Sequence, residues 1–214
     1  MTELEIWEQM TGKVFTIGQT VNRPQKGDCI KVEPVKTLED IANIKKHLTK
    51  NPRDLAIWTL GTNTNLRASD IVALTVGQLK HLKVGDDLLL KEKKTGKHRH
   101  ITINKTVHDT IQKLISTMPG VKDTSPLFQS RKGGKALTVP TLNNMVKGWC
   151  DWVGLKGNYG SHTLRKTMGY IQRVHFNTPL PVLTQMFNHA SQRETMIYLC
   201  IQPDEIRDAY FNEI

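Results

Sequence analysis

Six side chains of types that can cleave a phosphodiester are spread over four short segments of the 214-residue chain. They are two arginines, one lysine, two histidines and one tyrosine: Arg67, Lys94, His162, Arg165, His189 and Tyr198. Cleavage needs a nucleophile, stabilisation of charge on the non-bridging oxygens, and a proton for the leaving oxygen. Arginine meets the second need because its planar guanidinium can hold two oxygens at once. The set could work without a metal ion, and the sequence shows no acidic cluster suited to paired metal ions.

Taken one at a time, these residues have ordinary structural explanations. Arg67 could pair with Asp70 near a helix start, where an acidic residue usually caps the helix. His162 and Arg165 are three residues apart, so they share a helix face whether or not they react. Tyr198 stands between two apolar residues and has the pattern of a core aromatic side chain. The combination favours one shared site, because all four segments supply residue types that phosphodiester cleavage needs.

The order and spacing of these segments resemble the tyrosine recombinase family over about residues 37 to 205. Gly61 to Leu74 is similar to the family's first-arginine segment, in which arginine, a short residue, serine and an acidic residue lead into a helix. His162 and Arg165 match its His-x-x-Arg box, and the Leu-Phe-Gln-Ser stretch from Leu127 matches another family segment. The step of nine residues from His189 to Tyr198 matches the family's step from the second histidine to the nucleophile.

The resemblance implies a role for each residue in proton and bond transfer. Tyr198 would attack the scissile phosphate and leave a 3′-phosphotyrosine and a free 5′-hydroxyl. His162 would act as the general base towards the tyrosine proton, and Lys94 would protonate the leaving 5′-oxygen from the turn of a hairpin. Rejoining would be the reverse reaction with another strand's hydroxyl. Because the phosphotyrosine retains the bond energy, the resemblance implies no cofactor and no ATP.

The resemblance also implies which residues bind the phosphate. Arg67 and Arg165 would clamp the non-bridging oxygens, and His189 would donate a hydrogen bond to one of them. Basic side chains of the hairpin and of a later loop would contact the DNA backbone. We expect that set to be Lys91, Lys93, Lys97, Arg99, Arg131, Lys132 and Lys135.

The sequence departs from the family pattern in three places. Family members commonly carry glycine before the second histidine, whereas this chain has Asn188. Several lysines crowd the hairpin, and alignment on Lys-Thr-Gly and the following Arg99 favours Lys94 as the catalytic one. Larger members have a helical DNA-binding domain before the catalytic domain, and some 36 residues precede it here. We therefore expect either a compact family member or a fragment of a longer protein.

The elements that must position these residues are mainly helices. Thr37 and Asp40 predict a helix start, Pro52 predicts another, and a third begins near Arg67 to Ser69. Gly61 to Asn65 reads as a turn. The segment from Asp87 to Leu90, a basic turn, and the alternating Ile101 and Ile103 predict a β-hairpin. Further helices are expected at 106–117, 138–153, 162–174, 180–187, 193–199 and 203–213.

This pattern predicts a mainly α fold with a small antiparallel β-sheet, which is the fold of the tyrosine recombinase catalytic domain that the chain resembles. Residues 1–36 are expected to form an N-terminal extension or strand-like arm, and residues 37–214 the catalytic domain. His98 and His100 could face the same side of a strand, but no third ligand at a recognised spacing supports a metal site.

The composition agrees with a nucleic-acid partner. The formal net charge is +10 and the sequence pI is about 9.6, which favours binding to a polyanion such as double-stranded DNA. Three scattered cysteines form no disulfide or zinc pattern. The sequence has neither a signal peptide at its acidic start nor an apolar run long enough to cross a membrane, so we expect a cytoplasmic, nucleoid-associated protein.

The C-terminal residues carry a pattern that bears on assembly. Ile206, Tyr210 and Ile214 recur at four-residue intervals and predict an amphipathic helix. It could pack on its own domain or, by family analogy, dock into a neighbouring protomer. The resemblance thus implies a homotetramer on paired DNA sites, built from chains that can be monomeric in solution.

Two other functions fit parts of the sequence. A type IB topoisomerase uses a similar active site to relax supercoiled DNA, although the short chain and the oligomer-like tail argue against it. A DNA-binding regulator that has lost catalysis would keep the fold and the charge. The complete set of six reactive side chains argues against such a loss and favours site-specific recombination, in the form of integration, excision or inversion.

Overall fold

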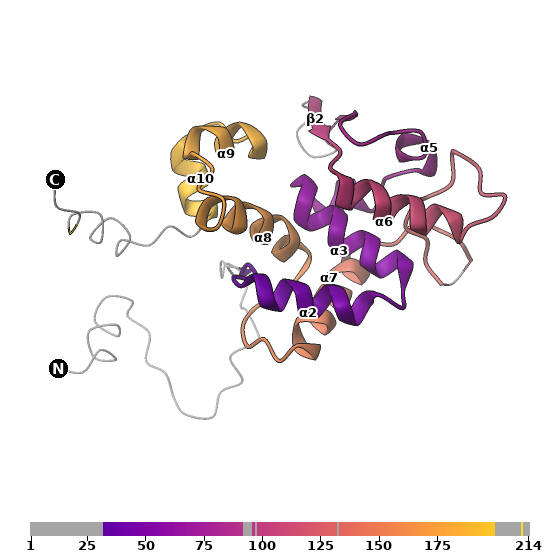
Figure 1. The fold of residues 1–214 in the computed structure, drawn as a ribbon, viewed down its shortest axis with the longest axis horizontal. Coiled ribbons are helices and arrows are strands. Elements are labelled where there is room, and N and C mark those ends of the chain that lie inside the picture. The colour runs from indigo at the N-terminus through magenta and orange to yellow at the C-terminus, as the bar shows by residue number, and fades with distance from the viewer. Residues whose placement is uncertain (1–31, 92–95, 97, 132, 200–210, 212–214) are drawn as a thin grey trace. The chain divides into compact units, whose positions relative to one another are not determined.

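The computed structural model describes residues 32–91, 96, 98–131, 133–199 and 211 (Figure 1). The described residues from Val32 to Leu199 belong to one compact unit. Its elements are α2 (Leu38–Leu48), α3 (Pro52–Thr64), α4 (Ala68–Ile71), α5 (Val76–Leu79), β1 (Asp87–Lys91), β2 (His98–Thr102), α6 (Lys105–Ser116), α7 (Val139–Trp152), α8 (Ser161–Val174), α9 (Leu180–Phe187) and α10 (Gln192–Tyr198). The predicted fold class, mainly α with a small antiparallel sheet, is confirmed.

Side-chain caps explain why the major helices begin where the sequence predicts. The Thr37 side chain accepts a hydrogen bond from the Asp40 backbone N–H at the start of α2, and Asn51 does the same for Asp54 at the start of α3. Asn104 caps α6 and Thr138 caps α7 in the same way. Each cap satisfies one of the backbone donors that a helix start leaves unpaired.

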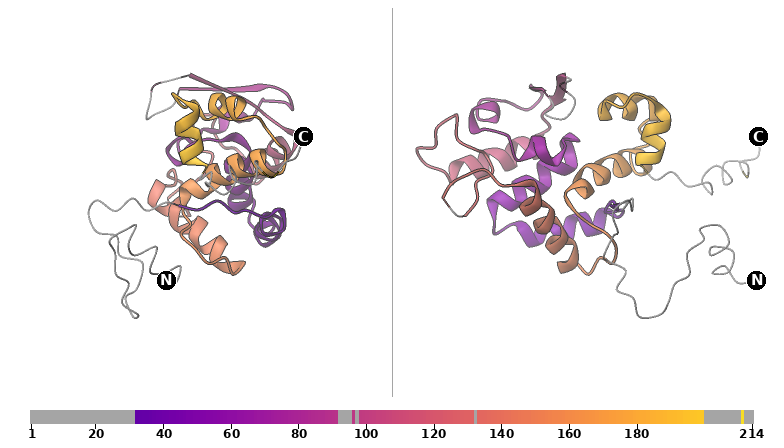
Figure 2. Two further views of the ribbon diagram at one scale, coloured as in Figure 1. Left: turned by 90° about the vertical axis from the view of Figure 1, so that its left-hand side faces the viewer. Right: turned by 180° about the vertical axis from the view of Figure 1, so that it is seen from behind.

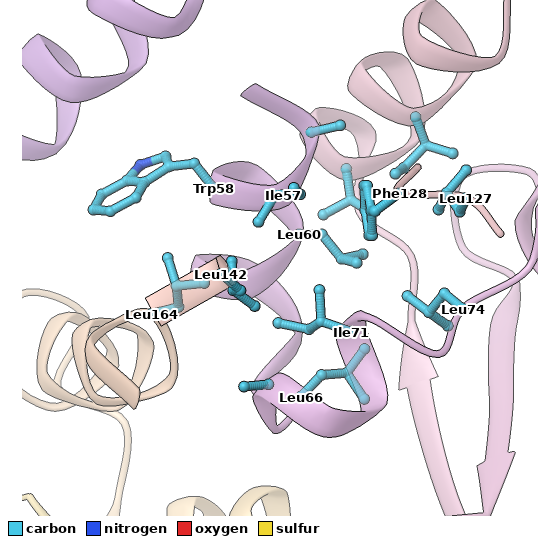
Figure 3. Close-up of a cluster of buried hydrophobic side chains, with 14 of the residues drawn as sticks. Ile57, Trp58, Leu60, Leu66, Ile71, Leu74, Leu127, Phe128, Leu142 and Leu164 are labelled. Atoms are coloured by element: carbon cyan, nitrogen blue, oxygen red, sulfur yellow. The ribbon is translucent and has the colours of Figure 1, made fainter. Parts of the chain in front are cut away.

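Helix α3 lies at the centre of the main core. Its side chains are buried on nearly all sides, as expected for a helix surrounded by other elements, and it packs against α2, α6 and α8. Trp58 and Leu60 of α3 meet apolar side chains that come from α7, α8 and the segment around Phe128 (Figure 3). This core fixes the ends of α3 and α8, from which the candidate reactive residues extend.

The predicted turn at Gly61 to Asn65 is wrong, because α3 continues through Thr64 and only Asn65 leaves the helix. Gly61 is buried where α3 packs against α8, and a Cβ atom added there would lie 2.7 Å from Leu164 Cδ1. The glycine therefore serves close helix packing rather than a turn. The short helix α5 was not predicted, because four residues are too few to show a helical period.

The hairpin is confirmed as an antiparallel pair of strands. Leu88 of β1 pairs with Ile101 of β2, and both side chains are buried, whereas His98 and His100 are exposed. Lys91 pairs with His98 at the end of the described ladder. The predicted turn residues Lys93, Lys94 and Lys97 lie outside the described residues.

Helices α9 and α10 pack against each other, and α9 also packs on α8 (Figure 2). Leu183, Phe187 and Leu199 form a second, smaller buried cluster there. Gly169 of α8 makes room for it, since a Cβ atom added at Gly169 would lie 2.5 Å from both Phe187 and Leu199. The close approach holds the C-terminal segment against α8.

The described end of the expected N-terminal arm belongs to this compact unit. Val35 is 1% exposed in the main core, and its backbone N–H donates to Thr167 Oγ1 at 2.8 Å. The backbone of Glu33 accepts a hydrogen bond from Thr163 at the start of α8. Residues 1–31 and the predicted helix 203–213 fall outside the description, apart from the single residue Phe211. No helix in the described ranges has the length and apolarity needed to cross a bilayer.

Candidate active site

The first candidate arginine is positioned by a left-handed residue that ends α3. Asn65 has φ 56° and ψ 25°, a conformation that asparagine tolerates better than most residues. Its Nδ2 donates to the backbone carbonyl of Met186 at 2.9 Å, which ties the end of α3 to the end of α9. Arg67 follows in extended conformation as the residue before α4. The turn at Asn65 thus sets the direction in which Arg67 leaves the core.

The second arginine lies on α8 and is almost completely buried. Arg165 is 3% exposed, and its guanidinium donates to the backbone carbonyl of Asn65 and, at 2.8 Å, to that of Phe187. Its Cζ atom also lies 4.8 Å from the centre of the Phe187 ring. These contacts hold the guanidinium in a fixed orientation between the end of α3 and the end of α9.

Arg99 joins the same group of contacts from β2. Its guanidinium donates to the carbonyl of Asn65 at 3.0 Å and to the carbonyl of Met186 at 2.7 Å, and the residue is 7% exposed. Two buried arginines therefore share one backbone acceptor. The predicted DNA contact of Arg99 remains a prediction, but the structure places this guanidinium inside the protein, where it connects the hairpin to α9.

His189 lies two residues after the end of α9 and is held on several sides. Its Nδ1 lies 2.9 Å from Thr195 Oγ1, and its ring stacks on Phe187 with centroids 5.1 Å apart. The side chain is 5% exposed. The pKa of His189 is lowered mainly by burial and also by the charges of nearby arginines, while Glu194 opposes the shift.

Tyr198, the candidate nucleophile, is the last residue of α10 and packs against these groups. Its ring centroid lies 5.3 Å from that of His189 and 5.1 Å from that of Phe187. Arg165 Cζ is 5.9 Å and Lys166 Nζ is 5.4 Å from the tyrosine ring. The tyrosine, one histidine and one arginine of the predicted set are thus brought together within one chain.

The remaining predicted residues surround this group in different ways. Arg67 lies near enough to His189 for its charge to lower the histidine pKa. His162 is exposed in the first turn of α8, three residues before Arg165. Lys94, the candidate acid, lies outside the described residues.

The predicted DNA-contacting residues fall into three groups. Lys91, Arg131 and Lys135 are described and exposed, the last two in a loop closed by a 2.7 Å hydrogen bond between the backbones of Ser130 and Lys135. Arg99 is buried, as given above. Lys93, Lys97 and Lys132 lie outside the described residues.

The sequence did not indicate a role for two residues of this site, Asn65 and Thr195. The carbonyl of Asn65 accepts from both buried arginines, and Thr195 supports the ring of His189. Asn65 could have been noticed as an asparagine that ends a helix, where left-handed residues are common. Thr195 lies three residues before Tyr198 and so shares its helix face, but that spacing alone indicates no function. In the described part of the chain, no group of three or more His, Cys, Asp and Glu side chains could hold a metal ion.

Comparison with known proteins gives this arrangement a family. The profile of the phage integrase family matches residues 32–205. The chain is 34% identical over 183 residues to a probable integrase/recombinase, YoeC, of Bacillus subtilis (strain 168), covering 84% of this chain and 95% of the relative. It is 30% identical over 160 residues to the tyrosine recombinase XerC of Caldanaerobacter subterraneus subsp. tengcongensis, covering 73% of this chain but 44% of that protein.

Solved structures agree on the fold. The XerH site-specific recombinase in a post-cleavage complex with a palindromic difH substrate superposes with a TM-score of 0.69, at 19% identity, over 88% of this chain and 54% of that one. The XerA recombinase gives 0.68, at 16% identity, over 88% of this chain and 65% of that one. The fold, the matched profile and the similar sequences agree, and the chain belongs to the phage integrase family.

Proposed function

We propose that this chain cuts and rejoins DNA through a covalent bond to Tyr198, and so acts in site-specific recombination. The observation that carries the proposal is the convergence of Tyr198 with Arg165 and His189 in one chain. Arginine and histidine donors beside a tyrosine supply a nucleophile and stabilise developing charge on a phosphate. The family and its recombinase members YoeC and XerC support the same activity.

In the proposed reaction, described residues bind the phosphate and remove the proton of the tyrosine. Arg67 and Arg165 hold the non-bridging oxygens, and His189 donates a third hydrogen bond. The carbonyls of Asn65 and Phe187 hold the guanidinium of Arg165 in one orientation beside Tyr198, which supports this role. His162 removes the proton of Tyr198 as the phosphotyrosine bond forms.

Leaving-group protonation is assigned to Lys94 by family resemblance. Lys94 stands in the sequence between Lys91 and His98, which pair at the end of the described strands. Arg99 then has an indirect part in the proposal, because its buried guanidinium holds β2 beside the ends of α3 and α9. A displaced hairpin would carry the acid away from the leaving oxygen.

The proposed partner is double-stranded DNA, bound along exposed basic side chains. Lys91, Arg131 and Lys135 are suited to the phosphate backbone, and the net charge of +10 favours the encounter. A reaction on chromosomal DNA would take place at the nucleoid. For the assembled enzyme we propose four chains on two paired DNA sites, linked through their C-terminal segments.

Covalent trapping tests the reaction. Nicked duplexes made from DNA that flanks the gene are incubated with the protein, and the products are separated under denaturing conditions. A slow DNA band that disappears after protease treatment is expected with the natural protein and absent with Tyr198→Phe. Tyr170→Phe is the matched control, because it removes the hydroxyl of a half-buried tyrosine on α8 and should leave the band unchanged.

The outcomes separate the possible functions. Covalent adduct formation that persists in Tyr198→Phe would contradict the assignment of the nucleophile. Relaxation of non-specific plasmid by the monomer would indicate a topoisomerase instead of a recombinase. DNA binding without an adduct in any variant would favour a regulator that lacks catalysis.

A further inference from the structure

The imidazole of His189 is supported by a chain of hydroxyl groups. Its Nδ1 lies 2.9 Å from Oγ1 of Thr195, a residue that is fully buried. Thr195 Oγ1 donates to Thr184 Oγ1 at 3.1 Å and is 3.4 Å from the carbonyl oxygen of Ser191. Thr184 in turn donates to the carbonyl of Leu180 at 2.8 Å. This series of hydrogen bonds therefore connects the backbone carbonyl of Leu180 on α9 to the Nδ1 edge of the His189 ring.

The donors along this series of hydroxyl groups favour one form of the imidazole. Each threonine hydroxyl has one proton to donate. The proton of Thr184 is directed to Leu180, whose carbonyl can only accept, and the proton of Thr195 is directed to Thr184. With these donors, the oxygen of Thr195 presents a lone pair to His189, and Nδ1 carries the hydrogen of the neutral ring.

The opposite arrangement is unfavourable in this buried place. If Thr195 donated to Nδ1, Thr184 would have to give up the carbonyl of Leu180 to donate to Thr195, or the two hydroxyl oxygens would face each other with lone pairs at 3.1 Å. A buried polar contact left without its hydrogen bond costs about 1–3 kcal/mol. Ser191 adds to the preference, because its carbonyl can also only accept the proton of Thr195.

The other ring nitrogen of His189 is the one that can reach a substrate. Glu194 Oε1 is 4.0 Å from Nε2, which is beyond hydrogen-bond range. A neutral imidazole has a single N–H, so an Nδ1–H tautomer leaves Nε2 as an acceptor. Such a ring repels a phosphate oxygen until Nε2 also gains a proton.

We propose that Thr195 is a positioning residue that holds neutral His189 as the Nδ1–H tautomer, so that Nε2 donates to a phosphate only when the imidazole is a cation. The tautomer is a property of the DNA-free protein, whereas its consequence for the phosphate rests on the proposed function. DNA binding would then include uptake of one proton from solvent by His189.

The charged surroundings of His189 agree with this coupling. Without DNA, burial and the three arginines lower the histidine pKa, and Glu194 raises it. A bound phosphate adds negative charge beside Nε2 and would raise the pKa again. The titratable and charged groups that face the ring come from four elements or their ends: Arg67, Arg99, Arg165, Glu194 and Tyr198.

Nitrogen NMR of the full chain, labelled with ¹⁵N-histidine and free of DNA, tests the tautomer directly. Spectra are recorded well above the pH at which His189 titrates, and His189→Gln identifies its signals. The expected pattern is a protonated Nδ1 and an unprotonated Nε2, retained in Thr195→Ser and shifted towards Nε2–H in Thr195→Val. A protonated Nε2 in the natural protein would overturn the proposal, even if Thr195→Val failed to fold.

The pH profile of single-turnover cleavage tests the consequence. At pH values above the pKa of His189 in the DNA complex, the cleavage rate of the natural enzyme should fall about tenfold per pH unit, because the fraction of protonated His189 falls by that factor. Thr195→Val, whose neutral ring can donate from Nε2, should lose less than about twofold over the same interval, while Thr195→Ser follows the natural profile. Equal pH dependence in the natural protein and Thr195→Val would contradict the coupling. If no variant cleaved DNA, the proposed function would fail while the NMR result on the tautomer would still stand.

Discussion

Arg99 on β2 donates a hydrogen bond of 2.7 Å to the backbone carbonyl of Met186, which connects the hairpin to the end of α9. The same guanidinium donates to the carbonyl of Asn65 at the end of α3. Three segments far apart in the sequence are thus joined at one planar group. Arg99, which the sequence led us to expect at the DNA, is therefore a candidate support for the reactive residues.

Replacement of Arg99 by methionine is expected to lower the free energy of unfolding by about 1–2 kcal/mol. We expect a small loss of stability for charged hydrogen bonds, because each carbonyl keeps another donor. Arg165 still donates to the carbonyl of Asn65, and the side-chain Nδ2 of Asn65 still donates to the carbonyl of Met186. Arg99→Lys should not restore the stability, since lysine cannot reach two acceptors with a fixed fork. Urea denaturation measures the change.

DNA affinity at several salt concentrations separates this support role from a phosphate contact. Arg131→Met, which removes an exposed arginine, should reduce the slope of log affinity against log salt by about 1 and leave stability unchanged. Arg99→Met should leave the slope unchanged. A reduced slope in Arg99→Met would show that its guanidinium reaches the DNA after all.

Gly61→Ala is expected to destabilise the protein by about 1–2 kcal/mol, although alanine favours helices by about 1 kcal/mol. The added Cβ atom would meet Leu164 Cβ at 2.9 Å, an atom fixed to the backbone of α8, so the helices must separate. Because Leu164 precedes Arg165, the cleavage rate should fall as well. Thermal denaturation and covalent trapping measure the two effects.

Gly148→Ala on α7 is the matched control for helix propensity. A Cβ atom at Gly148 meets nothing within 4 Å, so the substitution should stabilise the protein by about 0.5–1 kcal/mol. A stabilising effect of Gly61→Ala of similar size would contradict the close packing of α3 and α8.

Asn188→Gly is expected to leave the protein at least as stable, whereas Asn188→Ala should cost about 1 kcal/mol. Asn188 has φ 56°, a left-handed conformation that glycine adopts freely and alanine does not. Its buried Nδ2 also has no hydrogen-bond partner among the described residues, so glycine loses little. The departure from the family's usual glycine therefore preserves the turn before His189. Equal stability of the glycine and alanine variants would argue against this backbone requirement.

Stability should decrease as the pH falls below the usual histidine pKa of 6.5. The folded-state pKa of His189 is lowered, mainly by burial, so the unfolded chain takes up its proton at higher pH than the folded chain does. The stabilising contribution of the neutral ring is complete above pH 6.5 and is lost as the pH falls through the folded-state pKa. His189→Gln should weaken this decline, and urea midpoints between pH 5 and 8 in both proteins measure it. An identical pH dependence in the variant would contradict the shift.

Much of the fold follows from local sequence signals. Thr37 and Pro52 start helices as expected, and the alternation around Ile101 predicts the hairpin, because caps and side-chain periods act over a few residues. The predicted turn at Gly61 was wrong, because in a sequence a glycine required by close helix packing cannot be distinguished from a glycine required by a turn. Only the position of Leu164 on another helix distinguishes the two.

For the candidate site, the sequence by itself determined the family, through the spacing of His162 to Arg165 and of His189 to Tyr198. Those steps are local enough for one helix or one turn to fix them. The tertiary structure decided that the carbonyl of Asn65 accepts from both Arg99 and Arg165, and that Thr195 Oγ1 lies 2.9 Å from Nδ1 of His189. Backbone acceptors and burial carry no sequence signature, because any residue has a carbonyl and only folding brings it to a distant side chain.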